Sequence, residues 1–225
     1  MNKTALSMLF ALSTAVAVTA CGADASQAPL PATPVGTTGA TALPATGAAA
    51  AVTGTFNITP QNSKIEWTGA KTTYKHPGSF TSFSGKIDLA GPVEQGKVSV
   101  DIDTPSIAAA VDPTIGAMIE KLTGHLKSPD FFDVGKFPKA SFASTGIKTG
   151  GDNGAPYTVS GNLTIRGVTK PISFPATITA SPTKVDATAT FTINRKDFGI
   201  TIGGKPEDPI KDDVEIRLTI HADKG

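Results

Sequence analysis

The feature that most constrains this fold is a period-two alternation of apolar and polar residues, which begins near residue 53 and continues to the end of the chain. In its clearest stretch, residues 214 to 220, every second residue is Val, Ile or Leu. Strict alternation is typical of antiparallel strands that bury one face and expose the other. Similar runs lie at 65–67, 87–89, 98–102, 157–165, 172–178 and 185–193, with Gly, Pro, Asn or Asp between them. The pattern predicts eight or nine strands.

One stretch has helical periodicity instead. Apolar residues at i, i+3, i+4, i+7 and i+11 form one face of a helix, namely Ile115, Met118, Ile119, Leu122 and Leu126. Asp112-Pro113 precedes them and is typical of an N-cap followed by Pro at the first helical position. Gly116 and Gly124 lower the helix propensity, so we expect this helix to need the sheet beneath its apolar face.

About eight antiparallel strands and one short amphipathic helix predict an all-β protein. Closing the sheet into an up-and-down barrel removes its exposed edges, and a β-sandwich is the alternative that fits the same pattern. Small residues are mixed with large ones at the inward positions, including Gly161, Ala176, Ala187 and Ala189. Such residues either leave a cavity or taper a filled barrel, and periodicity does not choose between the two.

Residues 1–20 have the organisation of a bacterial signal peptide. Lys3 supplies a positive charge, and the uncharged apolar stretch that follows is shorter than the roughly 20 residues needed to span a bilayer. The sequence VTAC at 18–21 resembles a lipobox, which is cleaved before Cys21 and lipidated on the thiol of that cysteine. Cys21 is the only cysteine in the chain, so the chain forms no disulfide within itself. The alternative is an ordinary signal peptide with an incidental cysteine.

Residues 21–52 are built mainly from Ala, Gly, Pro, Thr and Ser, and Asp24 is their one charged residue. Such a composition buries too little apolar surface to offset the entropy of ordering, so it predicts a disordered tether before a folded domain at 53–225. A lipidated Cys21 would make the protein a periplasm-facing lipoprotein of the bacterial cell envelope. Gly22 follows the cysteine where lipoproteins kept at the inner membrane often carry Asp, which favours the outer membrane.

Motifs of catalysis and metal binding are missing. The chain contains no HEXXH, CXXC, GXSXG or Gly-rich phosphate loop, and its three histidines have no metal-binding spacing. We expect His76 in a KHPG turn, His125 near the C-terminus of the helix, where it suits the helix dipole, and His221 on the outward face of a strand. The sequence therefore predicts neither an enzyme nor a cofactor.

The charge composition of the chain does not indicate a nucleic-acid partner. The formal net charge is +1, so the chain lacks the electrostatic footprint of a nucleic-acid-binding protein. Carboxylates are paired at 130/133, 207/208 and 212/213, in polar loops that we expect to be solvated, and capping of a helix or turn is the expected role of Asp130.

The segment LKSPDFFDVGKFPKASF, residues 126–142, is expected to be a corner between the helix and a strand. Ser128-Pro129-Asp130 stops the helix, and Pro138 begins a strand whose inward residues are Ala140 and Phe142. Phe131 and Phe132 are predicted to plug or line one end of the barrel.

Six segments together resemble the YceI-like family over residues 55–222. In chain order they are SKIEWTGAK (63–71), HPGSFTSFSGKI (76–87), HLKSPDFFDVGKFPKASF (125–142), GNLTIRGVTKPISF (161–174), FTINRKDFGI (191–200) and IKDDVEIRLTIHA (210–222). The resemblance implies an extended lipocalin-like antiparallel β-barrel with a helical segment and a long apolar tunnel. It also implies a binding protein, and it allows a homodimer. GGKPEDPIKDD, residues 203–213, is expected to be a variable polar loop.

The ligand that the resemblance implies is a long-chain lipid such as an isoprenoid quinone or a polyprenol, held by a carrier or reservoir protein. Our candidates for the tunnel wall are Trp67, Phe80, Phe83, Phe131, Phe132, Phe142, Leu163, Ile165, Phe174 and Phe191, each of which could instead be plain barrel core. Arg166 and Arg195 are candidates for a polar mouth, either contacting a head group or pairing with a carboxylate such as Asp197. The alternative function is a non-enzymatic structural or stress-associated envelope protein with a filled barrel.

Overall fold

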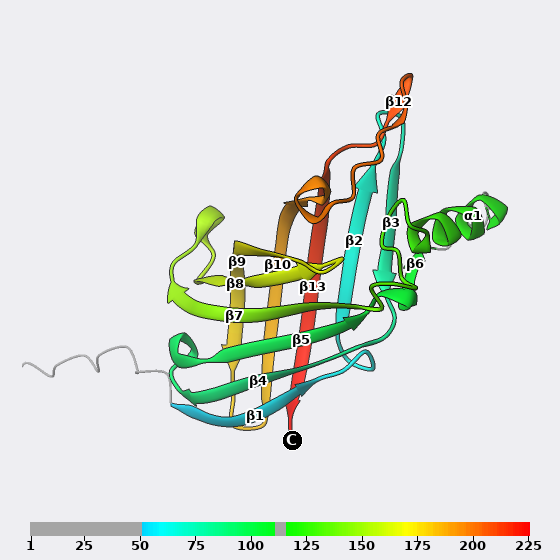
Figure 1. Cartoon of the computed structure of the whole chain (residues 1–225). Coiled ribbons are helices and arrows are strands. Elements are labelled where there is room, and N and C mark those ends of the chain that lie inside the picture. Colours follow the sequence, from blue (N-terminus) through cyan, green and yellow to red (C-terminus); the bar gives the residue numbers. More distant parts are fainter. Residues whose placement is uncertain (1–50, 111–115) are drawn as a thin grey trace, which may run out of the picture. The chain divides into compact units, whose positions relative to one another are not determined.

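The computed structural model of the protein describes residues 51–110 and 116–225 (Figure 1). One α-helix, α1 (Gly116–Lys127), accompanies the strands. The strands are β1 (Val52–Ile58), β2 (Lys64–Ala70), β3 (Lys75–Phe80), β4 (Phe83–Gly91), β5 (Lys97–Asp103), β6 (Ile107–Ala109), β7 (Lys139–Thr149), β8 (Tyr157–Ile165), β9 (Val168–Ala180), β10 (Lys184–Asn194), β11 (Gly204–Lys205), β12 (Asp208–Pro209) and β13 (Asp213–Lys224). Short 3₁₀ turns are η1 (Val93–Gln95), η2 (Thr104–Ser106), η3 (Asp152–Gly154) and η4 (Arg195–Phe198).

Eight of these strands close into a barrel. They follow the order β1-β4-β5-β7-β8-β9-β10-β13, and β1 pairs with β13 again, with every pairing antiparallel. Strands β2, β3 and β6 extend the sheet from β13 as a side branch, which Figure 1 shows rising beside the barrel. The predicted all-β barrel with one helix is confirmed, and the sandwich alternative is wrong.

Strand β13 is the strand at which the barrel closes. Its residues Glu215 to Thr219 pair with β2, whereas Asp223 and Lys224 pair with β1. Between them the hydroxyl of Ser63, only 3% exposed, accepts a hydrogen bond from His221 N at 3.0 Å and donates one to His221 O at 3.2 Å. One side chain thus satisfies both backbone groups at the point where β13 changes partner.

Fewer residues of helix α1 pack against the barrel than the sequence predicted. Leu126 is buried, and Ile119 and Leu122 pack against the core. Met118 is 63% exposed, so its predicted place on the packing face is wrong. The strand that the helix contacts most is the short strand β6, whose Ala109 N–H donates to Thr123 Oγ1, and one short strand covers less than a full helical face. Ile115 and the Asp112-Pro113 cap lie outside the described residues.

Two further local expectations need correction. The KHPG segment is not a turn, because His76 and Pro77 lie in β3 opposite Gly69 and Thr68 of β2. The polar segment 203–213 contains a small hairpin of β11 and β12 rather than loop alone. The predicted signal peptide, Cys21 and nearly all of the predicted tether lie outside the described residues. Among the residues that are described, no helix is long and apolar enough to cross a membrane.

The corner after α1 is a series of tight turns. Phe131 N donates to Ser128 O, Phe132 N to Leu126 O, and Phe137 N to Asp133 O. These bonds end the helix and direct both Phe131 and Phe132 inward, while the strand that follows buries Ala140.

We expect Ser63→Ala to lower the free energy of unfolding by about 1–3 kcal/mol, because it leaves the buried N–H and C=O of His221 without partners. Urea denaturation followed by circular dichroism measures the change. Ser84→Ala on the exposed face of β4 is the matched control and should stay within about 0.5 kcal/mol of the wild type. Equal, small effects of both substitutions would contradict the bridging role of Ser63.

Candidate functional site: an apolar cavity inside the barrel

The barrel encloses a cavity of about 240 Å³. Inward residues of all eight barrel strands, together with β2, α1 and the corner that follows it, form its wall. Among the described residues that line it, only Thr188, Arg195 and Lys211 have polar or charged side chains besides the indole of Trp67. The cavity can therefore hold an apolar body, and it offers polar contacts at very few points.

Small inward residues open part of this space. Ala176, Ala187 and Ala189 line the cavity on the neighbouring strands β9 and β10. Gly161 has a different role, since a Cβ at this position would collide with the ring of Phe142 on β7 and with the carbonyl of Ala143. The three alanines thus leave part of the cavity empty, whereas the space beside Gly161 is filled by the ring of Phe142.

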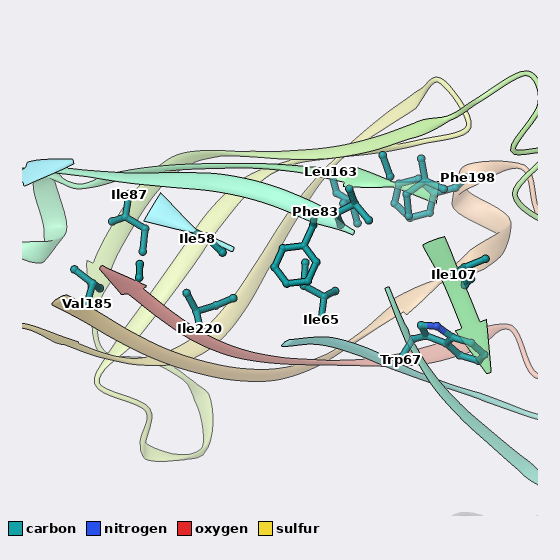
Figure 2. Close-up of a cluster of buried hydrophobic side chains, with 14 of the residues drawn as sticks. Ile58, Ile65, Trp67, Phe83, Ile87, Ile107, Leu163, Val185, Phe198 and Ile220 are labelled. Carbon is teal, nitrogen blue, oxygen red and sulfur yellow. The ribbon is translucent and has the colours of Figure 1, made fainter. Parts of the chain in front are cut away.

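Nine of the ten residues predicted for the tunnel wall line the cavity: Trp67, Phe80, Phe131, Phe132, Phe142, Leu163, Ile165, Phe174 and Phe191. Phe83 is buried in the core but does not line the cavity, and Figure 2 shows it beside Ile65 within the buried cluster. That any of these residues binds a ligand stays a prediction.

The aromatic side chains form two groups. On the barrel strands, Phe174 stacks on Phe191 with ring centroids 4.2 Å apart, and Phe142 lies 5.8 Å from Phe174. At the corner, Phe80 meets Phe132 edge to face at 5.8 Å. Stacked and edge-to-face contacts are geometries that aromatic pairs prefer, so these contacts add to the stability of the wall.

Arg195 lies in the cavity wall but its hydrogen bonds go to the protein. Only 4% exposed, it donates to Lys211 O from Nε at 3.0 Å, to Ile200 O from Nη1 at 2.7 Å, and to Ile210 O from Nη2 at 3.3 Å. These carbonyls belong to the segment between η4 and β13. Because Ile200 and Ile210 also line the cavity, Arg195 holds one end of the wall in place.

The ion-pair partner of Arg195 is Asp212, at 3.1 Å, and not the predicted Asp197. Lys196 reaches the other carboxylate oxygen of Asp212 at 2.8 Å. The hydrogen bond from Lys196, together with the positive charge of Arg195, holds the pKa of Asp212 below its ordinary value. The carboxylate therefore stays ionised beside the buried guanidinium.

Arg166, the second predicted mouth residue, does not line the cavity. It sits at the β8–β9 turn with φ 52° and donates from Nη1 to Phe131 O at 2.6 Å. Its guanidinium also lies 5.9 Å from the centroid of the Phe137 ring. Arg166 thus ties the turn to the phenylalanine corner.

The histidines outside the cavity include two that contact surface carboxylates. His125 lies 3.0 Å from Asp130, and His221 lies 2.6 Å from Asp186 on the outward face. Within residues 51–110 and 116–225, no group of three His, Cys, Asp or Glu side chains is placed to hold a metal ion.

Sequence reasoning missed the part of the wall that comes from irregular segments. Phe198 and Ile200 follow the end of β10, and Ile210 precedes β13, so strand alternation does not mark them as inward. The missed Lys211 lies in the same segment. Ile58 in β1 could have been found, because Phe56 and Ile58 alternate with polar residues.

Fold and cavity together define a lipocalin-like antiparallel barrel built around an apolar interior. The chain belongs to the YceI-like domain family, whose sequence pattern matches residues 56–222. A UPF0312 protein of Pseudomonas putida is 34% identical to it over 185 residues, which cover 78% of this chain and 91% of that protein. A UPF0312 protein of Yersinia enterocolitica is 37% identical over 153 residues, which cover 64% of this chain and 71% of that protein.

Solved structures share the fold. BcnA of Burkholderia cenocepacia superposes with a TM-score of 0.62 at 24% identity, over 73% of this chain and 99% of that one. A polyisoprenoid-binding domain from Saccharophagus degradans superposes with a TM-score of 0.58 at 16% identity, over 77% of this chain and 99% of that one. The family resemblance read from the sequence is confirmed.

We expect Arg195→Lys to lower the free energy of unfolding by about 1–3 kcal/mol. The ammonium group of lysine cannot donate hydrogen bonds to three carbonyls and to Asp212 at the same time, as the planar guanidinium does. Thermal and urea unfolding measure the loss. Arg217→Lys is the control, since the Arg217 side chain is 60% exposed and its ion pair with Glu215 is long, at 3.5 Å. A change at Arg195 no larger than that at Arg217 would show that the guanidinium does not hold this segment.

Proposed function

We propose that the protein binds one long-chain isoprenoid, or a similar amphiphile, inside the barrel, and that it acts as a carrier or reservoir rather than a catalyst. The observation that carries this proposal is the closed barrel around an apolar cavity of about 240 Å³. Family membership supports it, as does the polyisoprenoid-binding domain of Saccharophagus degradans that shares the fold.

The cavity can hold part of a long lipid chain. An apolar cavity of about 150 Å³ holds one benzene, or about 25 Å³ for each carbon, so a cavity of about 240 Å³ has room for about ten carbons. About two isoprene units are of this size, and the rest of a longer chain would extend through an end of the barrel.

Burial of the chain supplies the driving force. Each CH₂ group removed from water contributes about 0.8 kcal/mol, so about ten buried groups contribute about 8 kcal/mol before the cost of ordering the chain. Binding of this kind needs almost no polar contact, which agrees with the composition of the wall. A filled structural barrel, the alternative function, would not account for the empty space beside the three alanines.

Organic extraction and native mass spectrometry of the purified protein test the proposal. We expect about one long-chain lipid per barrel. Ala189→Phe should abolish uptake of a C20 prenol, because the new ring fills the space beside Ala176, its register partner on β9. Thr190→Phe on the adjacent outward position is the matched control and should retain uptake. Equal uptake by both variants, or no saturable binding by the wild type, would contradict the proposal.

We further propose that the barrel is anchored to the envelope through a lipid on Cys21. The support is the sequence VTAC at residues 18–21 and the absence of any other cysteine in the chain. A barrel on such a tether could exchange a lipid with the membrane that anchors it. An outer-membrane location and a homodimer remain parts of the proposal.

In its native host, Cys21→Ala should shift the protein from the membrane fraction to the released fraction, with the barrel still folded. Mass spectrometry of the mature wild-type N-terminus should find Cys21 as the first residue and carrying acyl chains. A mature N-terminus without acyl chains would contradict the anchor but leave the barrel proposal standing.

A further inference from the structure

The ladder between β9 and β10 stops partway along both strands. Only residues 185–189 of β10 pair with residues 176–180 of β9. Beyond this ladder β9 stays paired with β8, and β10 stays paired with β13. In Figure 1, β9 begins beside β8 and then turns to run beside β10. Residues 168–175 of β9 and 190–194 of β10 thus each have one edge that pairs with no strand of residues 51–110 or 116–225.

The direction of the backbone groups follows from β13. In an antiparallel sheet, successive residues point their N–H and C=O groups to opposite edges of the strand. The N–H and C=O of His221 bond to Ser63, just before β2, so the odd-numbered residues of β13 point toward β2 and the even-numbered ones toward β10. By register, the even-numbered residues of β10 then point their backbone groups toward β9.

A proline stands where the ladder stops. Continuing the register beyond the pair of Ala176 and Ala189 places Pro175 opposite Thr190, whose C=O points toward β9. Pro175 has no N–H to donate to this carbonyl, so the ladder ends there. The same register places a second proline, Pro171, opposite the end of β10.

Apolar side chains close the wall where the backbone pairing stops. Phe174 and Phe191 are the next inward pair in this register, and their rings stack with centroids 4.2 Å apart and planes 10° apart. The inward pair after them is Ile172 and Ile193, and all four residues line the cavity. The turn η4 contacts β9, and its buried Phe198 also lines the cavity.

The two sides of this stretch are held differently. β10 pairs with β13 along its whole length, and Arg195 ties the start of η4 to the segment before β13. Residues 168–175 of β9 pair with β8 alone among the described strands. Moving this part of β9 away from β10 breaks side-chain contacts but no rung of a β-ladder, which makes it an easier opening than a fully paired seam.

We propose that the unpaired stretch between β9 and β10 is the entrance of the cavity. Residues 168–175 of β9 move outward, the rings of Phe174 and Phe191 separate, and an apolar chain passes between them. The inference rests on the proposed lipid-binding function and specifies how the ligand reaches its site. The entrance lies where β10 leads into η4, at an end of the barrel.

Replacing the proline tests the entrance. Pro175→Thr supplies the missing N–H, so opening must break one more hydrogen bond. For the delipidated full-length protein, we expect the association and dissociation rates of the fluorescent fatty acid cis-parinaric acid both to fall by roughly 3- to 10-fold. The Kd should not change, because the barrel is closed both with and without the ligand. Stopped-flow fluorescence measures both rates.

The matched control is Pro182→Thr, in the turn between β9 and β10 and outside both strands. It removes a proline without adding a donor to the ladder, so it should keep the wild-type rates.

A cross-link tests the same movement without changing the proline. Ser173 and Thr192 fall opposite each other in the continued register, and both are exposed. Both are replaced by cysteine in a Cys21→Ala background, so that these are the only thiols in the chain. We expect uptake of cis-parinaric acid to stop when a cleavable bismaleimide joins them and to return when the linker is cleaved. The same protein capped with N-ethylmaleimide should take up the ligand at the wild-type rate.

The outcomes distinguish this inference from the proposed function. If cis-parinaric acid binds the cross-linked protein at the wild-type rate, the entrance lies elsewhere and lipid binding stands. If the wild type shows no saturable binding, both fail. Should Pro175→Thr not fold, the cross-linked protein still decides.

Discussion

Strand β13 is hydrogen-bonded along both edges, and the barrel depends on this double pairing. β10 follows one edge over its whole length, while β2 and β1 share the other edge in turn. Where β2 ends and β1 begins, the hydroxyl of Ser63 completes the ladder at His221. Without that edge the sheet would be an open curved layer, and its apolar face would lie in water.

Closure explains why the interior can stay partly empty. The strands are held by their backbone hydrogen bonds, so the interior need not be filled to fix the positions of the walls. Alanines at 176, 187 and 189 keep their part of the space open, while Arg195 fastens the irregular segment that covers one end. An empty apolar volume forgoes packing contacts, and a bound lipid would restore them.

The sequence predicted the regular parts of this structure well. Period-two alternation indicated the strands and the inward alanines, and six ordered segments identified the family. Phe131 and Phe132 were predicted at one end of the barrel from the turn chemistry between Leu126 and Pro138, and both line the cavity.

What the sequence could not show depends on contacts between distant residues. Asp197 is two residues from Arg195, yet the chain turns back through η4 and the β11–β12 hairpin and brings Asp212 to the guanidinium instead. Phe83 and Phe174 both lie on inward faces, but only their neighbours on adjacent strands decide which one borders the cavity. Nothing in the alternation indicates that Ser63 would act in place of a strand residue. Nor does it indicate that the indole of Trp67 would lack an acceptor within residues 51–110 and 116–225.

The most direct test of the central claim is a high-resolution crystal structure of the protein purified from its native host. We predict continuous, elongated electron density inside the barrel, along Phe142, Phe174 and Phe191. A cavity that has collapsed, or that contains only separate waters, in protein that was never delipidated would contradict the claim that this barrel holds a lipid.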